Sequence, residues 1–298
     1  MLTIQYLEYS PDLARLDPSI LVNRLRRAVD ILPISHLLIG WHLPQNLLEA
    51  CRLEADHLGL RFLRWQPLLT SDKGICIDPS WYAEGLVGGK VPGFQGLPEF
   101  TFLCPNHPAV QDALLKHLEA MLRQGVYQGF FLDRVRYPSP SVDPLKHLAC
   151  FCDYCCRKAA QQGLDLPGLR QAILQQLAGE AGRIALVKML LSEMVDFAPS
   201  QPNHALSQLL AFRQKSVTDF LALIIQVLKG AQLEVGLDCF SPSLAPLVGQ
   251  ELKSLAQLVD WVKLMTYAHT YAPAGLPYEV LGLVHYLACS TQLDEAQA

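Results

Sequence analysis

In the first 138 residues, short runs of hydrophobic residues alternate with longer segments in which hydrophobic residues recur every three or four positions. The first pattern is typical of buried strands and the second of amphipathic helices. The predicted strands span residues 2–9, 36–43, 60–69 and 129–138, and the predicted helices span 19–32, 44–59 and 109–125. Such alternation indicates a parallel sheet whose strands are joined by right-handed helical crossovers.

Beyond residue 139 the pattern changes to long helices. Helices are predicted at 167–197, 203–230, 251–258 and 278–290, and strands at 234–242 and 260–268. The sequence therefore predicts one α/β domain over residues 1–298, a TIM-type (β/α) barrel with a cysteine-containing helical insertion at 139–232. A closed barrel has eight strands and only six are predicted, so either the barrel is incomplete at its C-terminal end or the insertion hides a strand.

The composition fits a large folded domain and excludes several classes of partner. The chain has 298 residues, 51% of them hydrophobic, which suffices for a barrel of roughly 250 residues. A net charge of -4 without a basic stripe argues against nucleic acid as a partner. The N-terminus does not resemble a leader peptide, and no apolar run approaches about 18 residues. We therefore expect no membrane association and a cytoplasmic location, where the cysteines stay reduced.

Polar and aromatic residues gather where the predicted strands end. They are Glu8, Trp41, His42, Trp65, Gln66, Asp133, Arg134, Arg136, Tyr137, Asp238, Thr266, Tyr267 and His269. In a parallel α/β barrel, the carboxyl ends of the strands surround the active site. Aromatic rings stack on the apolar faces of sugars, and carboxylate, amide and guanidinium groups bind sugar hydroxyls. The pattern therefore favours a carbohydrate as the substrate.

Asp133 and Asp238 are the two carboxylates that we expect to perform chemistry. Each follows an apolar strand, GFFL before Asp133 and EVGL before Asp238. Glycoside hydrolysis needs two carboxyl groups about 5–5.5 Å apart for retention of the anomeric configuration, or about 6.5–9.5 Å apart for inversion. Neighbouring strands lie about 4.8 Å apart, so short side chains on them meet either requirement. Which carboxyl group would be the nucleophile and which the acid stays open at this point.

Four segments resemble one group of proteins. GFFLDRVRYP is similar to the strand G-h-h-h-D-x-h-R-Y-P, where h is hydrophobic, of glycoside-hydrolase-like TIM-barrel families. CPNHP ahead of a helix, CFCDYC and DWVKLMTYAH resemble further segments of these families. Together the four segments cover the chain from about residue 100 to 270.

This resemblance implies a glycoside-hydrolase-like barrel. Carried over to this sequence, it makes Asp133 the leading catalytic carboxylate and implies that Arg136 and Tyr137 position it or the substrate. Asp238 and Tyr267 would line the same cleft. Barrel enzymes of this kind often take a catalytic acid or a substrate contact from their last two strands, which this sequence does not show.

The predicted site residues also have structural alternatives. Asp133 could form an ion pair with Arg134 or Arg136 that ties down a loop, and Asp238 could be a cap or turn residue. The residues predicted to bind substrate are Trp41, His42, Trp65, Gln66, Arg136, Tyr137, Tyr267 and His269. For the tryptophans the alternative is a place in the core. The histidines are expected to hydrogen-bond in the pocket rather than to bind metal.

One tight cluster contains four cysteines in the spacing C-x-C-x-x-C-C: Cys150, Cys152, Cys155 and Cys156. Structural zinc sites usually have four ligands in paired spacing. The sequence lacks a clear second pair, and the candidates to complete the site are Cys104, His107 and His147. A zinc ion bound here would be structural, pinning the loop after the fourth strand, rather than catalytic. The alternative, a set of buried, reduced thiols at the start of a helix, is the one that this spacing favours.

The sequence thus predicts a glycoside-hydrolase-like enzyme that cleaves glycosidic bonds of an oligo- or polysaccharide by two-carboxylate acid/base chemistry. That reaction requires no cofactor. The alternative is a non-catalytic relative of such hydrolases, a barrel that binds carbohydrate or a partner protein through the same mouth. A metal-dependent hydrolase is a third hypothesis, but it needs a ligand cluster that the sequence does not assemble. An open barrel exposes strand edges that a second copy could cover, so the oligomeric state stays open.

Overall fold

The computed structural model describes residues 1–7, 16–41, 43–70, 75–97, 100–141, 143–195 and 205–292. Within them, the strands are β1 (Thr3–Tyr6), β2 (His36–Ile39), β3 (Arg61–Pro67), β4 (Gly129–Asp133), β5 (Glu234–Phe240) and β6 (Trp261–Met265). The helices are α1 (Pro18–Ile31), α2 (Gln45–His57), α3 (Pro108–Gln124), α4 (Pro144–His147), α5 (Asp153–Gln161), α6 (Leu166–Leu177), α7 (Glu180–Val195), α8 (Ala205–Gly230), α9 (Leu252–Ala256) and α10 (Leu276–Ser290). Each of the six predicted strands is present.

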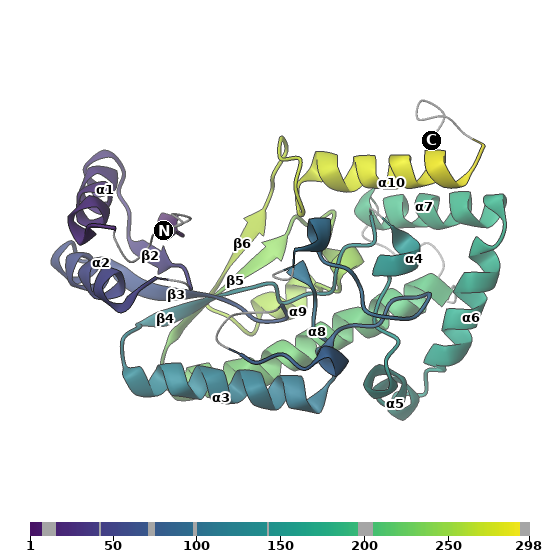
Figure 1. The fold of residues 1–298 in the computed structure, drawn as a ribbon, viewed down its shortest axis with the longest axis horizontal. Coiled ribbons are helices and arrows are strands. Elements are labelled where there is room, and N and C mark those ends of the chain that lie inside the picture. Colours follow the sequence, from purple (N-terminus) through teal and green to yellow (C-terminus); the bar gives the residue numbers. More distant parts are fainter. Residues whose placement is uncertain are drawn as a thin grey trace.

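The described strands form one parallel sheet in the order β1-β2-β3-β4-β5-β6, the same as their order along the chain. The sheet curves strongly (Figure 1). His36 of β2 lies 3.0 Å from the carboxylate of Glu234 on β5, three strands away. The indole of Trp261 on β6 also lies edge-on to His36, with 6.5 Å between ring centroids. The sheet is therefore an open half-barrel, in keeping with an incomplete TIM-like barrel.

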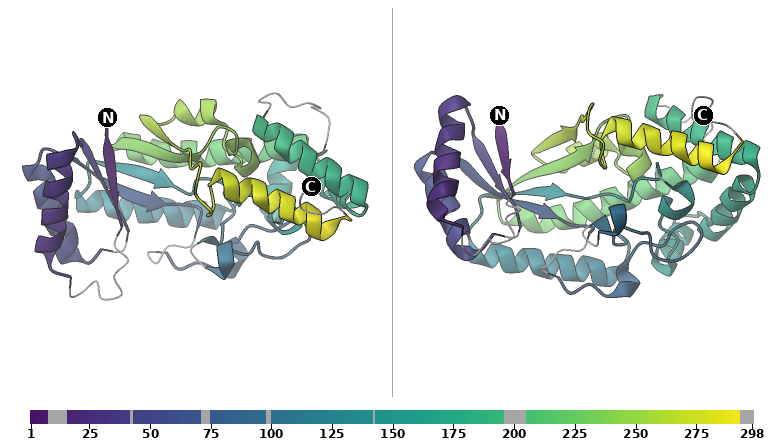
Figure 2. Two further views of the ribbon diagram at one scale, coloured as in Figure 1. Left: turned by 90° about the horizontal axis from the view of Figure 1, so that it is seen from above. Right: turned by 45° about the horizontal axis from the view of Figure 1, so that its top comes forward.

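Helices cover the outer face of this half-barrel (Figure 2). α1 and α2 pack on β1 to β3, where Leu21 lies in one core with Leu37 and Phe62. α3 and α8 lie along β4 and β5, where Phe130 and Val235 belong to a second, larger core. The strands are nearly continuously apolar because both faces of the sheet bury side chains, one against the helices and the other toward the inside of the barrel.

Local sequence signals set the ends of the covering helices. Asp17 accepts a hydrogen bond of 2.9 Å from the backbone N–H of Ser19, and Pro18 opens α1. Gly125, with a φ of 62°, ends α3 in the left-handed conformation that glycine adopts without a steric penalty. These signals explain why both helix boundaries fall close to their predicted positions.

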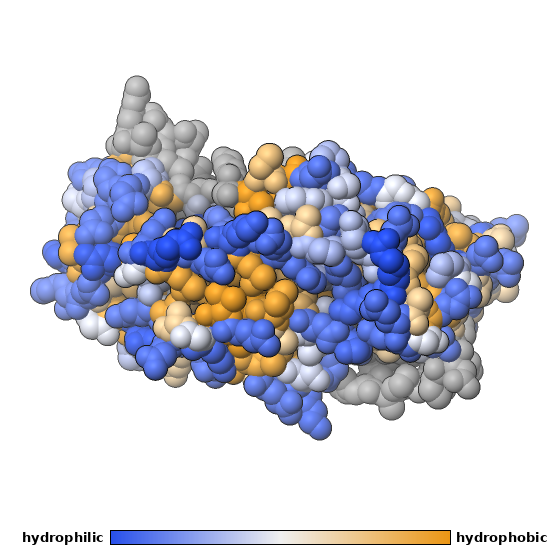
Figure 3. Space-filling model, turned by 90° about the horizontal axis from the view of Figure 1, so that it is seen from below, coloured by the Kyte–Doolittle hydropathy of each residue, from blue (hydrophilic) through white to orange (hydrophobic). Residues whose placement is uncertain are grey.

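Five helices, α4 to α8, lie between β4 and β5. The segment predicted as one helix at 167–197 is two helices, α6 and α7, because the chain turns at Ala178 and Gly179. α10 runs beside α7 at the far end of the molecule (Figure 1). The view from below, the side on which α3 lies, is mostly polar with one hydrophobic patch near its middle (Figure 3). None of the helices in the described residues combines the length and hydropathy needed to cross a membrane.

Candidate active site

Three polar side chains, those of Asp133, Asp238 and Lys263, form one row across β4, β5 and β6. Asp238 pairs in register with Lys263 of β6. Leu132 pairs with Leu237, which places the following residues, Asp133 and Asp238, side by side on β4 and β5. Residues in register on parallel strands point to the same face. The two predicted carboxyl groups therefore share the inner face of the half-barrel.

Asp133 is buried, with 8% of the residue exposed, and its carboxylate is held by two hydrogen bonds. Trp65 Nε1 donates to Oδ2 over 3.1 Å, and the backbone N–H of Arg134 donates to Oδ1 over 2.6 Å. The guanidinium of Arg134 lies 3.9 Å from Oδ2, a long ion pair. The carboxylate is thus held by a neighbouring indole and by the backbone of the next residue.

Arg134 adopts a backbone conformation that is unusual for a residue with a side chain. Its φ is 56°, in the left-handed region. The guanidinium lies over the rings of Trp41, at 5.4 Å, and Phe100, at 4.5 Å, and it donates to the hydroxyl of Thr70. Strained backbone of this type tends to occur at functional sites, and here it turns the chain sharply after Asp133.

Asp238 is more deeply buried than Asp133, with 3% of the residue exposed. Lys263 Nζ donates to both carboxylate oxygens, over 3.2 and 3.0 Å. Burial, together with the negative charge of Asp133, raises the pKa of Asp238 to about 7, although Lys263 and Arg136 act in the opposite direction. Near neutral pH, Asp238 can therefore both donate and accept a proton.

Lys263 is a site residue that sequence reasoning missed. Its ammonium group bridges Asp238 and the hydroxyl of Tyr267, to which Nζ donates over 3.0 Å. Burial lowers the pKa of Lys263, but the contacts with Asp238 and Tyr267 outweigh this and raise it. The signal was a charged residue inside the apolar strand DWVKLMTYA, which a strict two-residue alternation places on the same face as Tyr267.

Aromatic rings line the inner face beneath the carboxyl pair. Phe131 stacks on Trp261 with centroids 5.3 Å apart and an interplanar angle of 10°. A Cβ on Gly236 would lie 2.3 Å from the ring of Trp261, so only glycine fits between them. Trp65 meets Trp41 edge to face at 5.3 Å. Trp65 therefore packs against other rings and also contacts Asp133. The packing agrees with a place in the core, and the contact with Asp133 agrees with a role in sugar binding.

Other predicted residues lie elsewhere. Gln66 points to the outer face, because it follows Trp65 on the same strand, and its amide donates to the carbonyl of Pro67. Tyr137 is fully buried, away from the mouth. His269 is exposed in the loop after β6. Predictions for His42 and Glu8 fall outside the described residues.

Arg136 lies close to the carboxyl pair without forming a salt bridge to it. Its guanidinium is sandwiched between the rings of Phe102 and Phe240, at 4.5 and 4.4 Å from their centroids. Burial lowers the pKa of Arg136 to about 10, and the charges of Asp133 and Glu279 counteract this only in part.

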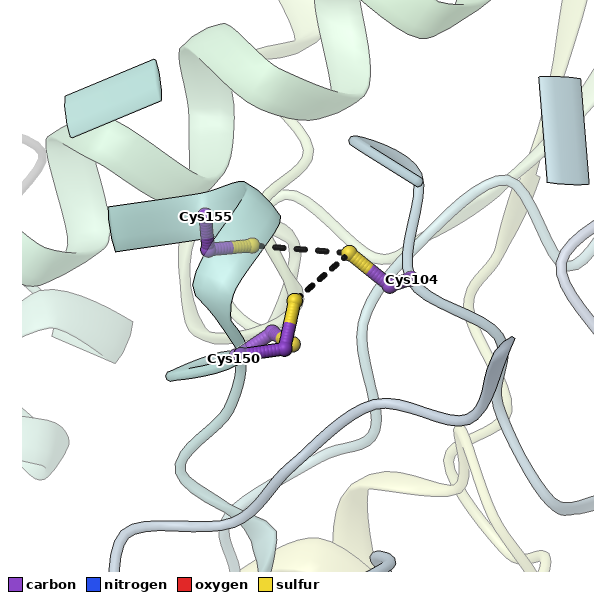
Figure 4. Close-up of side chains that lie close together, drawn as sticks. Cys104, Cys150 and Cys155 are labelled. Carbon is purple, nitrogen blue, oxygen red and sulfur yellow. Dashed lines mark hydrogen bonds between the residues drawn. The ribbon is translucent and has the colours of Figure 1, made fainter. Parts of the chain in front are cut away.

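The cysteine cluster is assembled differently from its prediction (Figure 4). The Sγ atoms of four residues lie within 4.8 Å of one another: Cys104, Cys150, Cys152 and Cys155. The predicted ligand Cys156 is not among them, since its thiol faces the carbonyl of Phe151 at 3.5 Å. The helical spacing of α5 turns Cys156 away from Cys155, and Cys104 reaches the cluster from the loop before α3.

His107 and His147 do not complete the cluster either. His107 Nδ1 accepts from the backbone N–H of Ala109 and caps α3. His147 Nδ1 contacts the carbonyl of Asp143. Both imidazoles therefore serve local backbone contacts instead.

The four thiols fit a tetrahedral zinc ion. Zn–S bonds of about 2.3 Å imply S···S separations of about 3.8 Å. Cys104 lies 3.5 Å from Cys155 and from Cys152. The backbone N–H of Glu84 donates to the Cys150 sulfur, and Asn106 Nδ2 donates to the Cys155 sulfur. Outer contacts of this kind orient metal ligands.

Comparisons with known proteins define the class of fold. No protein-family profile and no curated protein matches the chain. Among solved structures, it is similar to the glycoside hydrolase domain of PgaB (BpsB) from Bordetella bronchiseptica, at 15% identity and a TM-score of 0.59. That alignment covers 97% of this chain and 80% of the other.

Two further structures are similar at 13% identity. The β-galactosidase from Marinomonas ef1 has a TM-score of 0.54, covering 97% of this chain and 46% of the other. The alpha-L-fucosidase isoenzyme 2 from Paenibacillus thiaminolyticus has a TM-score of 0.52, covering 87% of this chain and 34% of the other. The chain therefore spans less than half of these two enzymes. The structural neighbours are glycoside hydrolases, and the fold is one that such enzymes share.

Proposed function

We propose that the protein hydrolyses glycosidic bonds of an oligo- or polysaccharide with Asp133 and Asp238 as its two catalytic carboxyl groups. One observation carries this proposal: the two residues directly follow the paired residues Leu132 and Leu237 on β4 and β5, they share one face, and the pKa of Asp238 is raised to about 7. A carboxyl group whose pKa is raised toward neutrality is typical of a general acid. The glycoside-hydrolase fold of the structural neighbours supports the same conclusion.

In the proposed reaction, the Asp133 carboxylate attacks the anomeric carbon while protonated Asp238 gives its proton to the departing glycosidic oxygen. A water molecule then attacks the glycosyl-enzyme ester and passes a proton to Asp238, which releases the sugar and regenerates Asp133. Neighbouring strands are about 4.8 Å apart, which favours the short carboxyl separation of retaining enzymes. Trp41, Trp65 and Tyr267 would contact the sugar.

The proposal also covers the domain organisation, the cofactor, the partner and the location of the protein. We infer that residues 1–298 form one barrel domain and that 139–232 is an insertion in it. One sheet joins β1 to β6, and one hydrophobic core runs from Leu68 to Leu287 through both the sheet and the insertion. The proposed reaction needs no cofactor, and a zinc ion held by the four clustered cysteines would be structural. A carbohydrate is the proposed partner, and the cytoplasm stays a prediction.

A binding protein without catalysis is the second candidate. The observation that favours it is the side chain of Asp238, of which 4% is exposed and both oxygens accept from Lys263. A carboxyl group so enclosed could serve only to hold β5 and β6 together. In that case the mouth would bind sugar without cleaving it.

The test is hydrolysis of a panel of aryl glycosides and oligosaccharides by the wild type and by Asp133→Asn. We expect turnover of at least one sugar class, and a fall to below about one thousandth in the variant. Asp112→Asn is the control, since Asp112 is exposed and pairs only with Lys116 on α3. Binding of an oligosaccharide without turnover by the wild type would support the second candidate. Equal turnover by the wild type and Asp133→Asn would refute the first.

A further inference from the structure

A cavity of about 480 Å³ lies next to Arg136. Its walls are residues 92–96 and 100–102, the chain that follows β4, and the start of α10. Arg136 lines it, and the charge of Arg136 acts on Asp133 and Asp238 as well. Arg136 therefore connects the cavity with the proposed catalytic groups, and the size of the cavity is within the roughly 300–1,000 Å³ of small-molecule sites.

Arg136 brings a positive charge to this cavity, and the carboxylates whose charges act on it, Asp133, Asp238 and Glu279, form no salt bridge with it. The residue is 6% exposed, and Nη1 donates to the carbonyl of Tyr137 over 3.2 Å. No described residue forms a salt bridge with it, although a buried charge normally requires a partner. Phe102 and Phe240 cover the two faces of the guanidinium, which leaves its edge for a further acceptor.

The other charged groups of the cavity already have partners. The carboxylate of Glu279 accepts from the hydroxyls of Ser139 and Ser141 and from the backbone N–H of Ala274. Lys146, at the rim, pairs with Asp143 over 2.8 Å. Arg136 is therefore the charged group of this cavity that has the most unused hydrogen-bond donors. An anionic group of a ligand would use them.

The wall of the cavity is aromatic. Phe94 meets Phe100 and Tyr278 edge to face, with centroids 5.8 and 5.7 Å apart. All three residues line the cavity. Such rings pack against the apolar face of a sugar ring, whereas a free inorganic anion gains nothing from them.

We propose that this cavity is a subsite for a uronic acid residue of the polysaccharide, with the sugar carboxylate paired to Arg136 and the sugar ring against Phe94, Phe100 and Tyr278. The inference rests on the proposed function, because it takes the cavity as part of the same substrate cleft. A guanidinium edge donates two parallel N–H hydrogen bonds to the two oxygens of a carboxylate, which matches a uronate better than a neutral hydroxymethyl group.

The test measures binding rather than turnover, so it stays separate from the hydrolysis experiment. Isothermal titration of the wild-type chain with galacturonate and glucuronate oligomers is compared with titration by the neutral galactose and glucose oligomers of equal length. We expect at least one uronate to bind about 10- to 100-fold more tightly than its neutral counterpart. Arg136→Met, which keeps an apolar chain between the two rings, should remove that preference.

Lys146→Met is the matched control, because it deletes a positive charge at the rim of the same cavity. We expect it to keep the preference for the uronate. Equal binding of acidic and neutral oligomers, a preference that survives in Arg136→Met, or no binding at all would each overturn the inference. Competition by acetate at the same concentration as the uronate would show an anion site without sugar recognition, and would overturn it too. If the protein binds uronates but does not hydrolyse them, the subsite is supported and only the proposed catalysis is contradicted.

Discussion

At the scale of single residues, Asp133 and Asp238 show how one functional group acquires two roles. Asp133 accepts two N–H hydrogen bonds, whereas Asp238 accepts from a lysine and is the more deeply buried. Its pKa of about 7 is raised by burial and by the charge of Asp133. We infer that proton transfer belongs to Asp238 and that Asp133 acts as the nucleophile.

Replacing Lys263 with methionine should raise the pKa of Asp238 above about 7, because the ammonium group is a main influence that lowers it. Carbon-13 NMR titration of labelled aspartate carboxyl groups measures this directly. Lys116→Met, which removes an exposed lysine on α3, should leave the titration of Asp238 unchanged. An unchanged or lower pKa in Lys263→Met would show that Lys263 does not control the proton of Asp238.

The same shift has a consequence for stability. The pKa of Asp238 is raised from 3.8, so Asp238 holds its proton more tightly in the folded state than in the unfolded state. Its contribution to the free energy of unfolding is present in full below about pH 4 and is lost as the pH rises through about 7. Urea unfolding at several pH values should show this decline in the wild type and its absence in Asp238→Asn. Parallel pH profiles for the two proteins would contradict the assignment.

At the scale of secondary-structure elements, local sequence patterns predict which strands exist but not which residues become neighbours. The apolar run GFFL ending in Asp133 predicts β4 and its polar end, and both are present. The register that places Asp133 beside Asp238 depends on residues about one hundred positions apart, so one strand's pattern contains no information about it. The pattern of β6 does place Lys263 on the same face as Tyr267, but only the register with β5 shows that Lys263 meets Asp238.

Two other differences follow from geometry inside an element. Gln66 and Trp65 are consecutive on β3, so only one of them can face the inside of the barrel, and the sheet determines that it is Trp65. Cys155 and Cys156 are consecutive on α5, so they point in directions about 100° apart and cannot both reach one ion. The sequence shows these pairs but does not say which member faces the site.

Gly236 of β5 offers a test at this scale. Gly236→Ala would place a Cβ 2.3 Å from the ring of Trp261, so the indole must move away from Phe131. We expect a loss of about 1–3 kcal/mol in the free energy of unfolding, measured with urea, and a change in tryptophan fluorescence. Gly179→Ala is the control, since nothing lies within 4 Å of the added Cβ there. Equal stability of both variants would mean that the ring packing does not constrain β5.

At the scale of the whole molecule, the cysteine cluster connects parts that are distant along the chain. Cys104 precedes α3, whereas Cys150, Cys152 and Cys155 lie at or just before the start of α5. An ion held by these four sulfurs would fasten the loop before α3, which contains Phe102, to the segment that follows β4. The zinc site would thus stabilise the wall of the cavity without touching the substrate.

We expect the purified protein to contain about one zinc ion per chain, as measured by elemental mass spectrometry. Cys104→Ser should lose the ion and lower the melting temperature, because one of four ligands is removed. Cys156→Ser should keep the ion and the wild-type melting temperature, since the thiol of Cys156 lies outside the cluster. A metal-free wild type, or equal losses in the two variants, would contradict the assignment.

The most direct test of the central claim compares two substrates that differ only in their leaving group. Asp238→Asn should lose at least about a hundredfold in rate on a glycoside with a poor leaving group, because that oxygen needs a proton as it departs. It should lose much less on the same glycoside with a dinitrophenolate leaving group, whereas Asp133→Asn should be inactive on both. Equal losses on both substrates in Asp238→Asn, or an active Asp133→Asn, would contradict the division of roles between the two carboxyl groups.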